Sequence, residues 1–226
     1  MNLLSIVRNI RKINLIKTIY FNFHYFPIKI AIHMPFFIYW RSRLRKMNGR
    51  VEIDAPIKMG MVRFGKLGLG IQDPLYPRTT WEVRGTLVIK GEVNIGRGSR
   101  ISIGERGVLT IGNAFSITGN SVIICDKEVI FGSYCFLSWD ILIMDTDSHS
   151  IYNEDGTIIN NPQSILFGNH VWIGCRTTIL KGVSIADNSI ISATSTLTRD
   201  INESNCIVGG HGKNCQIIKR NVNWRK

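Results

Sequence analysis

A strict six-residue repeat constrains this chain more than any other feature. One large apolar residue returns at every sixth position over five unbroken hexads, FGNHVW, IGCRTT, ILKGVS, IADNSI and ISATST. The recurring residues are Phe167, Ile173, Ile179, Ile185, Ile191 and Leu197. An α-helix repeats every 3.6 residues and a simple strand every two, so neither element produces this period. The hexads therefore predict a repeat architecture in which each hexad is one structural unit.

A prism with flat sides accounts for this period. Each hexad forms one side and its corner, and three sides close a coil of 18 residues. The recurring apolar residue then points inward onto its equivalent one coil away, while Gly, Asn and Asp supply the tight bends. Stacked coils form parallel sheets and bury their apolar residues only against neighbouring coils. We therefore expect an all-β solenoid with atypical ends.

The same register continues upstream with two slips of phase, through Ile95 and Ile101, then Ile111, Ile117, Ile123 and Val129, then Phe131, Leu137 and Ile143. Each slip predicts a corner insertion or a bulge. The largest interruption, residues 144–166, predicts a loop extruded from the prism. We therefore divide the chain into an N-terminal segment (1–48), a β-helix domain (49–201) and a C-terminal turn with a basic tail (202–226).

The N-terminal segment carries most of the positive charge. Residues 1–50 hold ten Lys and Arg and no acid, so they account for +10 of the net charge of +12. These cations are mixed with aromatic and aliphatic residues, which disfavours nucleic acid as a partner. Two interpretations stay open. The segment is either mostly helical and lies peripherally on anionic lipid, or it is a helical cap packed on the end of the prism.

Targeting and redox signals favour the cytoplasm. Arg8, Arg11, Lys12 and Lys17 interrupt the apolar run that a secretory signal needs, and residues 20–40 fall short of a clean membrane span. The five cysteines are odd in number and contain no CxxC pair, which suits a reducing compartment. We expect a cytoplasmic protein, with a peripheral contact to the inner face of the membrane under the first interpretation of the N-terminal segment.

Two stretches, ILIMDTDSHSIYN and FGNHVWIGCRTTILKGVSIADNSIISATSTLTRDI, resemble the hexapeptide-repeat acyltransferases, in particular the bacterial sugar and polysaccharide O-acetyltransferases. The second stretch is similar to that family's VWIG, GV and TKDI run almost residue for residue, and the resemblance covers most of the chain. It implies a left-handed parallel β-helix, an exception to the right-handed rule for parallel crossovers. It also implies a homotrimer, acetyl-CoA as the donor and a sugar hydroxyl as the acceptor.

A histidine in the expected loop is the candidate general base. Acetyl transfer from a thioester to an alcohol needs a group that takes the hydroxyl proton, and an imidazole suits neutral pH. His149 lies in the loop beside Asp145 and Asp147. In an extended chain these alternate positions point to one side, so a carboxylate can orient the imidazole. The resemblance places the family's catalytic histidine here. We predict His149 as base, with Asp147 or a backbone carbonyl as the orienting group.

The acceptor and donor contacts follow largely from the resemblance. Trp139 and Asp140 lie just before the loop, where relatives present a polar residue to the acceptor, and with Asp145 they form the predicted acceptor group. An equally good interpretation makes Asp140 a corner residue that bonds its own turn. The resemblance places CoA along the C-terminal coils, on Trp172, Gly174, Cys175, Ala193, Thr198 and Arg199.

Three departures bear on the donor site. Arg199 replaces the usual lysine of the family, which keeps a phosphate contact with a different geometry. Ser192-Ala193-Thr194 replaces the family's GAG, and residues 209–213 replace AGVPAK without its proline. The path of the tail over CoA therefore stays open.

Other functions on this fold fit the sequence less well. A zinc enzyme of the γ-carbonic-anhydrase kind needs histidines paired on one coil, but His149, His170 and His211 lie about 20 and 40 residues apart, and we predict no metal. A non-catalytic binding module needs no DTDSHS loop, and no glycine-rich nucleotide-binding half precedes the repeats. Serine, xenobiotics and sugars all stay open as acceptors. The basic, aromatic N-terminus favours a lipid-linked glycan precursor of capsule or O-antigen.

Overall fold

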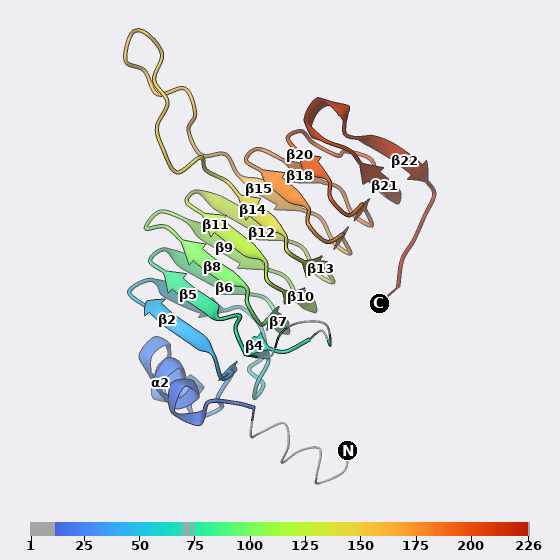
Figure 1. Cartoon of the computed structure of the whole chain (residues 1–226). Helices are drawn as coiled ribbons and strands as arrows, with labels where there is room; N and C mark the ends of the chain where they lie inside the picture. Colours follow the sequence, from blue (N-terminus) through green and yellow to red (C-terminus); the bar gives the residue numbers. More distant parts are fainter. Residues whose placement is uncertain (1–11, 69, 71–72, 74, 226) are drawn as a thin grey trace.

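The computed structural model describes residues 12–68, 70, 73 and 75–225, which form a stack of coils with one strand per coil in each of three sheets (Figure 1). Strand order in the first sheet is β1-β4-β7-β10-β13-β16-β19-β21-β22, in the second β2-β5-β8-β11-β14-β17-β20, and in the third β18-β15-β12-β9-β6-β3. The pairs are parallel except β21–β22. From β1 to β20 neighbouring strands are three apart in strand order, as the prism of hexads predicts.

Short strands separated by tight corners build every coil. The first-sheet strands are β1 (Phe36–Ile38), β4 (Val62–Lys66), β7 (Val93–Gly96), β10 (Phe115–Gly119), β13 (Phe136–Trp139), β16 (Trp172–Ile173), β19 (Ile190–Ile191), β21 (Cys206–Gly209) and β22 (Gln216–Arg220). The second-sheet strands are β2 (Ser42–Lys46), β5 (Thr79–Val83), β8 (Arg100–Ile103), β11 (Val122–Cys125), β14 (Leu142–Met144), β17 (Thr178–Leu180) and β20 (Thr196–Leu197). The third-sheet strands are β3 (Arg50–Ile53), β6 (Thr86–Ile89), β9 (Val108–Ile111), β12 (Glu128–Phe131), β15 (Ile165–Phe167) and β18 (Ser184–Ile185).

The recurring apolar residues form the core, as the repeat predicts. All six are buried, and they stack in pairs 18 residues apart, Phe167 on Ile185, Ile173 on Ile191 and Ile179 on Leu197. Each pair buries apolar surface that one coil alone leaves exposed, which makes the array rather than the coil the stable unit.

The two slips of phase have two structural causes. Strands β8, β9 and β12 each have four residues with two inward side chains, so the inward position advances by two within one strand. In β12, for example, Val129 and Phe131 are both buried. The corner between β8 and β9 also has four residues (104–107), against two (126–127) at the equivalent corner of the next coil. The first slip therefore contains the predicted corner insertion, whereas the second comes from the longer strand β12.

The sheets extend beyond the predicted bounds of the β-helix at both ends. Strands β1 and β2, inside the segment 1–48, pair in parallel with β4 and β5. Strand β21, inside the tail 202–226, pairs in parallel with β19, and β22 returns antiparallel to it after the short 3₁₀ turn Gly212–Asn214. The tail is therefore partly strand, and not only a turn followed by a basic extension.

A helical cap closes the N-terminal end of the prism. Helix α2 (Leu15–Tyr25) places Phe21 against Phe36 and Trp81, with ring centroids 4.8 and 4.9 Å apart. The Asn22 amide donates to the Phe36 carbonyl at 2.8 Å and accepts from its N–H at 3.1 Å, which satisfies β1 at the sheet edge. The short helix α3 (Ile28–Ala31) follows. This packing is the arrangement that the cap interpretation expects. Residues 1–11, with Arg8 and Arg11, lie outside the described residues.

Within the described ranges, no helix has the length and apolar character needed to span a bilayer.

Candidate active site

A long loop leaves the prism between β14 and β15, where the sequence predicts it (Figure 1). It begins after Met144 and ends before Ile165, slightly inside the predicted bounds 144–166. Its outer part is a hairpin closed by an antiparallel bridge between Tyr152 and Ile158. The Gln163 N–H donates to the Asp145 carbonyl at 3.0 Å, which brings the two ends of the loop together at the prism edge.

Asp145 stands at the root of this loop as a structural residue. Its side chain is fully buried, with Oδ1 accepting from the Asp126 N–H at 2.7 Å and Oδ2 from the N–H groups of Lys127 and Glu128 at 2.7 and 2.8 Å. These three backbone donors belong to the corner between β11 and β12. The prediction of Asp145 as an acceptor-binding residue is wrong, because backbone donors occupy both carboxylate oxygens and no face of the carboxylate is exposed.

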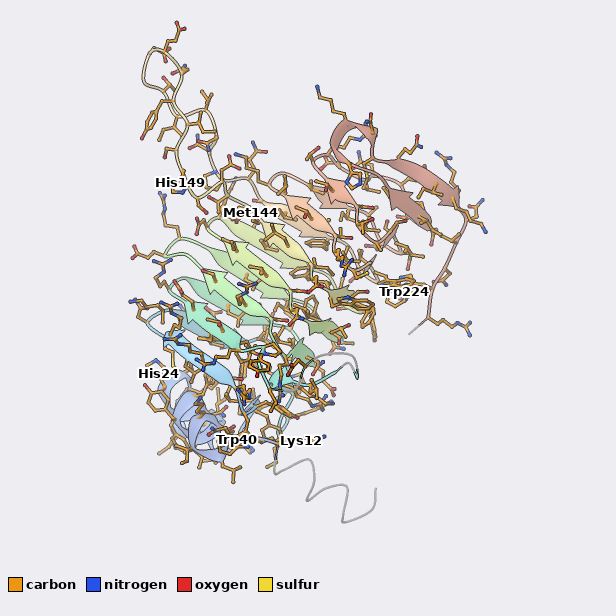
Figure 2. The ribbon with its side chains drawn as sticks, in the orientation of Figure 1. Lys12, His24, Trp40, Met144, His149 and Trp224 are labelled. Atoms are coloured by element: carbon orange, nitrogen blue, oxygen red, sulfur yellow. The ribbon has the colours of Figure 1, made fainter. Side chains whose placement is uncertain are left out.

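His149 lies exposed beside the prism edge, on the first turn of the loop (Figure 2). Ser148 adopts a left-handed conformation with φ of +63°, so the chain turns sharply just before the histidine. The Asn160 side-chain amide donates to the His149 carbonyl at 2.8 Å from the returning arm of the loop. The backbone of His149 is thereby fixed while its ring faces solvent.

Asp147 bonds to the loop and to the next coil. Its Oδ2 accepts from Lys181 Nζ at 2.5 Å and from Asn160 Nδ2 at 2.8 Å. Lys181 also donates to the Asn160 carbonyl at 2.9 Å. The hydrogen bond from Lys181, and then that from Asn160, hold the pKa of the Asp147 carboxyl below its ordinary value. In the described part of the chain this carboxylate therefore anchors the loop on Lys181, and makes no hydrogen bond to the His149 ring.

The predicted site residues gather on two edges of the prism. The loop, Lys181 and the Thr198-Arg199 pair follow β14, β17 and β20, so they lie on the edge between the second and third sheets in successive coils. The other edge lies between the first and second sheets. It carries Trp139, Asp140, Gly174, Cys175 and Ala193, which follow or end β13, β16 and β19. The three residues of β17 separate the two edges by about 10 Å along one coil.

Stacked left-handed corners shape the second of these edges. Asp140, Arg176 and Thr194 have φ values of +57°, +58° and +60°, one above another in successive coils. Arg176 donates its N–H to the Trp139 carbonyl at 2.9 Å, and Thr194 donates to the Cys175 carbonyl at 2.8 Å. This observation supports the corner interpretation of Asp140. Its carboxylate is exposed and lies 4.0 Å from the Arg176 guanidinium, a contact worth little at the surface.

The predicted donor residues are close-packed at their corners. A Cβ on Gly174 would lie 2.4 Å from the Ala193 N, so glycine is required for the coils to approach there. Trp172 donates from its ring to the Ser138 hydroxyl at 3.3 Å on the outer face of the first sheet. On the other edge, Arg199 donates to the Cys215 carbonyl, so its guanidinium holds the C-terminal segment as well as facing solvent.

Comparison with known proteins agrees with this architecture. The model of the bacterial transferase hexapeptide family (six repeats) matches residues 165–199. The polysialic acid O-acetyltransferase of Escherichia coli O1:K1 / APEC is 33% identical over 140 residues, 61% of this chain and 42% of the relative. The galactoside O-acetyltransferase of Escherichia coli (strain K12) is 34% identical over 118 residues, 51% of this chain and 55% of the relative. The chain spans about half the length of these curated relatives.

A solved structure extends the match to most of the chain. The crystal structure of the polySia-specific acetyltransferase NeuO superposes with a TM-score of 0.51 and 25% identity, covering 82% of this chain and 72% of the other. Residues 165–199 of this chain are hexapeptide repeats of that family, and the fold of the chain is that of NeuO. The left-handed parallel β-helix implied by the sequence resemblance is confirmed as its fold.

Two residues of this hexapeptide-repeat site were missed by sequence reasoning. Asn160 and Lys181 lie 11 and 32 residues after His149, and hydrogen bonds join both to the root of the loop. Lys181 had a weak signal in the sequence, since it is the one charged residue of the hexad ILKGVS. Asn160 had none, because only the returning arm of the loop brings it to the histidine.

The buried cysteines have a structural role. Four of the five free cysteines are buried in the core, and burial raises the pKa of Cys135 to about 12. They are small core hydrophobes, as the sequence suggests. Across the described ranges, no three His, Cys, Asp or Glu side chains gather as a metal site would require.

Proposed function

We propose that this hexapeptide-repeat protein is an acyl-CoA-dependent O-acetyltransferase that acetylates a sugar hydroxyl, in the synthesis of a polysaccharide such as capsule or O-antigen. The observation that carries the proposal is the placement of His149 at the loop root, on the same prism edge as Thr198 and Arg199. The named activities of the relatives, O-acetylation of polysialic acid and of galactosides, support a sugar acceptor.

In the proposed reaction the imidazole of His149 accepts the proton of an acceptor hydroxyl while the hydroxyl oxygen attacks the thioester carbonyl carbon of acetyl-CoA. The tetrahedral intermediate then collapses, the C–S bond breaks, and the imidazolium returns the proton to the departing thiolate. The products are the acetyl ester and free CoA thiol. Trp172, Gly174, Cys175 and Ala193 are the proposed contacts for the thioester arm, with Thr198 and Arg199 for the phosphate end.

Acceptor-dependent release of CoA thiol tests the proposal directly. The panel contains sugars, sugar nucleotides, serine and a xenobiotic alcohol, each with acetyl-CoA. We expect release with a carbohydrate acceptor. If CoA thiol is released with serine alone, the acceptor is serine and not a sugar. If no member of the panel gives release of CoA thiol, the proposal is contradicted.

We also propose a homotrimer whose active sites lie between neighbouring prisms. The two candidate edges of one prism are separated by the outer face of the second sheet, so a neighbour can bring donor contacts to the His149 loop. That face carries half-buried apolar residues, and the loop exposes Ile151, Tyr152 and Ile159 by 52%, 59% and 61%. Light scattering at micromolar concentration should give a particle of three chains. A monomer at that concentration contradicts the shared site.

Asp147 is proposed to position the His149 loop through Lys181. We expect Asp147→Asn and Lys181→Met each to lower turnover by about 3- to 10-fold, because each breaks the same ion pair, and the double variant to lose no more than either single variant. Since the pKa of the Asp147 carboxyl is lowered in the folded chain, the anchor is present above its ordinary pKa and weakens as the pH falls through the depressed value. If Asp147 orients the imidazole directly, Asp147→Asn lowers turnover far more than Lys181→Met.

The N-terminal cap is proposed to bind anionic membrane surface, which would bring the enzyme to a lipid-linked acceptor at the cytoplasmic face. Its outward side exposes an apolar face made of Leu15, Ile16, Ile19, Tyr20, Phe23, Ile28 and Ile32. Exposed cations flank this face at Lys12, Lys29, Arg41 and Arg43. Exposed aliphatic and aromatic side chains next to exposed cations match the interfacial region of an anionic bilayer.

The membrane proposal is tested with two variants, each of which replaces one exposed isoleucine with glutamate, at opposite ends of the prism. Ile16 is 82% exposed, so Ile16→Glu leaves folding intact and should weaken partitioning into vesicles of phosphatidylcholine and phosphatidylserine by about 10-fold or more. Ile218→Glu, on the opposite end at 62% exposure, is the control and should bind as the parent chain does. Equal partitioning of the two variants contradicts the membrane proposal.

A further inference from the structure

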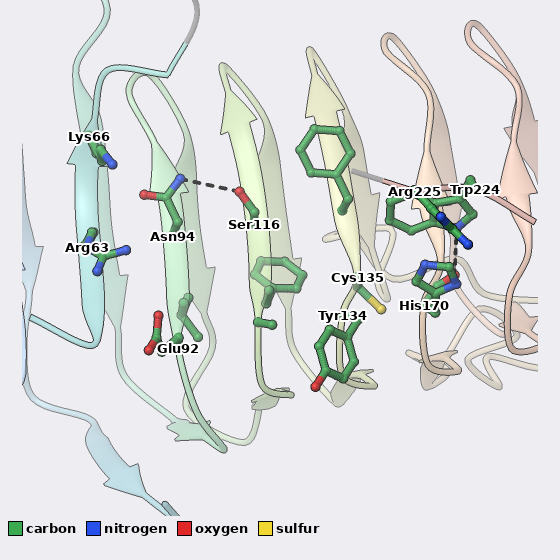
Figure 3. Close-up of a pocket in the computed structure, with 14 residues that line it drawn as sticks. Arg63, Lys66, Glu92, Asn94, Ser116, Tyr134, Cys135, His170, Trp224 and Arg225 are labelled. Atoms are coloured by element: carbon green, nitrogen blue, oxygen red, sulfur yellow. Dashed lines mark hydrogen bonds between the residues drawn. The ribbon is translucent and has the colours of Figure 1, made fainter. Parts of the chain in front are cut away.

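A groove on the outer face of the first sheet lies on the side of the prism away from the His149 loop, and its wall residue Trp224 contacts Trp172, with ring centroids 5.9 Å apart. The groove has a volume of about 540 Å³, crosses the strands β4, β7, β10 and β13, and reaches His170 at the corner before β16 (Figure 3). Its side wall near the C-terminal coils includes Trp224, which lies far from His149 in the view of Figure 2. Four strand spacings of about 4.8 Å make the groove about 19 Å long, parallel to the prism axis. An elongated ligand fits this shape better than a compact one.

Positive charge is concentrated at both ends of the groove. Arg63 and Lys66 on β4 form one end, and Arg225 from the C-terminal tail lies at the other (Figure 3). Glu92 is the one carboxylate among the lining residues. No ion pair joins any of these three cations to a carboxylate in the described part of the chain. Arg63 and Lys66 therefore repel each other at one end of the groove, and an anion bound there would relieve this repulsion.

The pKa of Lys66 is lowered by burial and by the neighbouring cations. Burial lowers this pKa most, and repulsion from Arg63 and then Lys12 lowers it further. A negatively charged partner therefore stabilises the protonated form of Lys66 more than it stabilises that of an isolated surface lysine.

Aromatic side chains form the middle and the far wall. Trp224 stacks on the His170 ring with centroids 4.2 Å apart and planes inclined by 3°, and its indole N–H donates to the His170 carbonyl at 2.9 Å. Tyr134 is 59% exposed beside it, and Phe136 lies next along β13. Flat aromatic surfaces with polar edges are typical of sites that pack against the apolar faces of sugar rings.

The floor of the groove has unmet hydrogen-bonding capacity. Asn94 donates to the Ser116 hydroxyl at 3.4 Å, but its side-chain Oδ1 is shielded from solvent and accepts no hydrogen bond from the described residues (Figure 3). A shielded acceptor without a donor costs free energy. A ligand hydroxyl that reaches this oxygen would supply the missing donor.

From these observations we infer that the groove binds a segment of carboxylate-bearing glycan, the chain on which the proposed transferase acts. The cations at the two ends pair with carboxylates spaced along the chain, the exposed ring of Tyr134 packs on a sugar face, and Asn94 with Glu92 takes sugar hydroxyls. A polyphosphate or a nucleic acid strand fits less well, because Glu92 repels closely spaced phosphates. The inference rests on the proposed function only in naming the glycan as the acceptor.

Calorimetric binding of an oligomer of sialic acid tests the inference without turnover. The parent chain should bind it, and should bind its carboxyl-reduced, neutral form far more weakly. Arg63→Gln with Lys66→Gln should weaken binding by about 10- to 100-fold, since two charge-assisted contacts are lost. Tyr134→Ala should weaken it by about 3- to 10-fold. The control Arg106→Gln removes an exposed cation outside the groove and should leave the affinity for the oligomer unchanged.

Separate outcomes identify separate failures. Unchanged affinity in the Arg63→Gln, Lys66→Gln variant, with thermal unfolding as in the parent chain, overturns the inference while leaving the proposed transferase intact. Inorganic polyphosphate that binds as tightly as the oligomer and is equally sensitive to these changes also overturns it, because the groove is then a general anion site. If the oligomer binds as expected but no CoA thiol is released with any acceptor, the inference about the groove is supported and the proposed activity is contradicted.

Discussion

His149→Ala is expected to lower acetyl transfer by about 10²–10⁴-fold, the contribution of a general base. The imidazole acts on the acceptor hydroxyl, and it does so only as the proton leaves, so the loss should appear in kcat with the KM for acetyl-CoA nearly unchanged. The measurement is initial-rate release of CoA thiol over a matrix of acceptor and donor concentrations.

Two other variants make this result specific to His149. His33→Ala removes an exposed histidine from the N-terminal cap and should retain the parent rate. Arg199→Ala should give the opposite kinetic pattern, with a raised KM for acetyl-CoA and turnover largely retained at saturation, because its proposed role is in holding the donor. A His149→Ala enzyme that transfers acetyl to the true acceptor at the parent rate contradicts the mechanism.

The hexads predicted the fold because a six-residue period leaves few alternatives. Inward residues such as Ile173 and Ile191 must stack once the chain closes into coils, and the structure pairs them. The loop was predictable for the same reason, as an interruption of a regular pattern. The two interpretations of the N-terminal segment were not separable by composition, since exposed cations and apolar residues occur in both. The contact of Phe21 with Phe36 and Trp81 shows one side of the helix packed on the prism, while the other side stays exposed.

The internal geometry of the loop was not predictable from its sequence. The grouping of Asp145, Asp147 and His149 on one side assumed an extended chain, but the left-handed conformation of Ser148 breaks the alternation. Asp145 turns into the prism and His149 turns out. The anchor of Asp147 depends on Lys181, 34 residues away, and a contact at that separation is set by the stacking of coils and not by local spacing.

Asp145→Ala is expected to destabilise the chain by about 2–4 kcal/mol, although it lies only four residues from the proposed base. The variant removes the acceptor of three backbone N–H groups at the corner between β11 and β12. Water can reach part of that corner, since Lys127 is exposed, so the loss is smaller than the sum of three charge-assisted bonds. The melting temperature should fall by roughly 5–15 °C.

Denaturant unfolding of Asp145→Ala, Asp145→Asn and Asp155→Ala separates a structural role from a role in binding. Asp155 lies exposed at the loop tip, and its replacement should leave stability within about 0.5 kcal/mol of the parent value. Asp145→Asn keeps one carbonyl oxygen as an acceptor but places an amide donor against N–H groups, so it should still destabilise. If Asp145→Ala instead unfolds as the parent chain does and raises only the KM for the acceptor, the carboxylate contacts substrate after all, and the buried arrangement is not the one that operates in turnover.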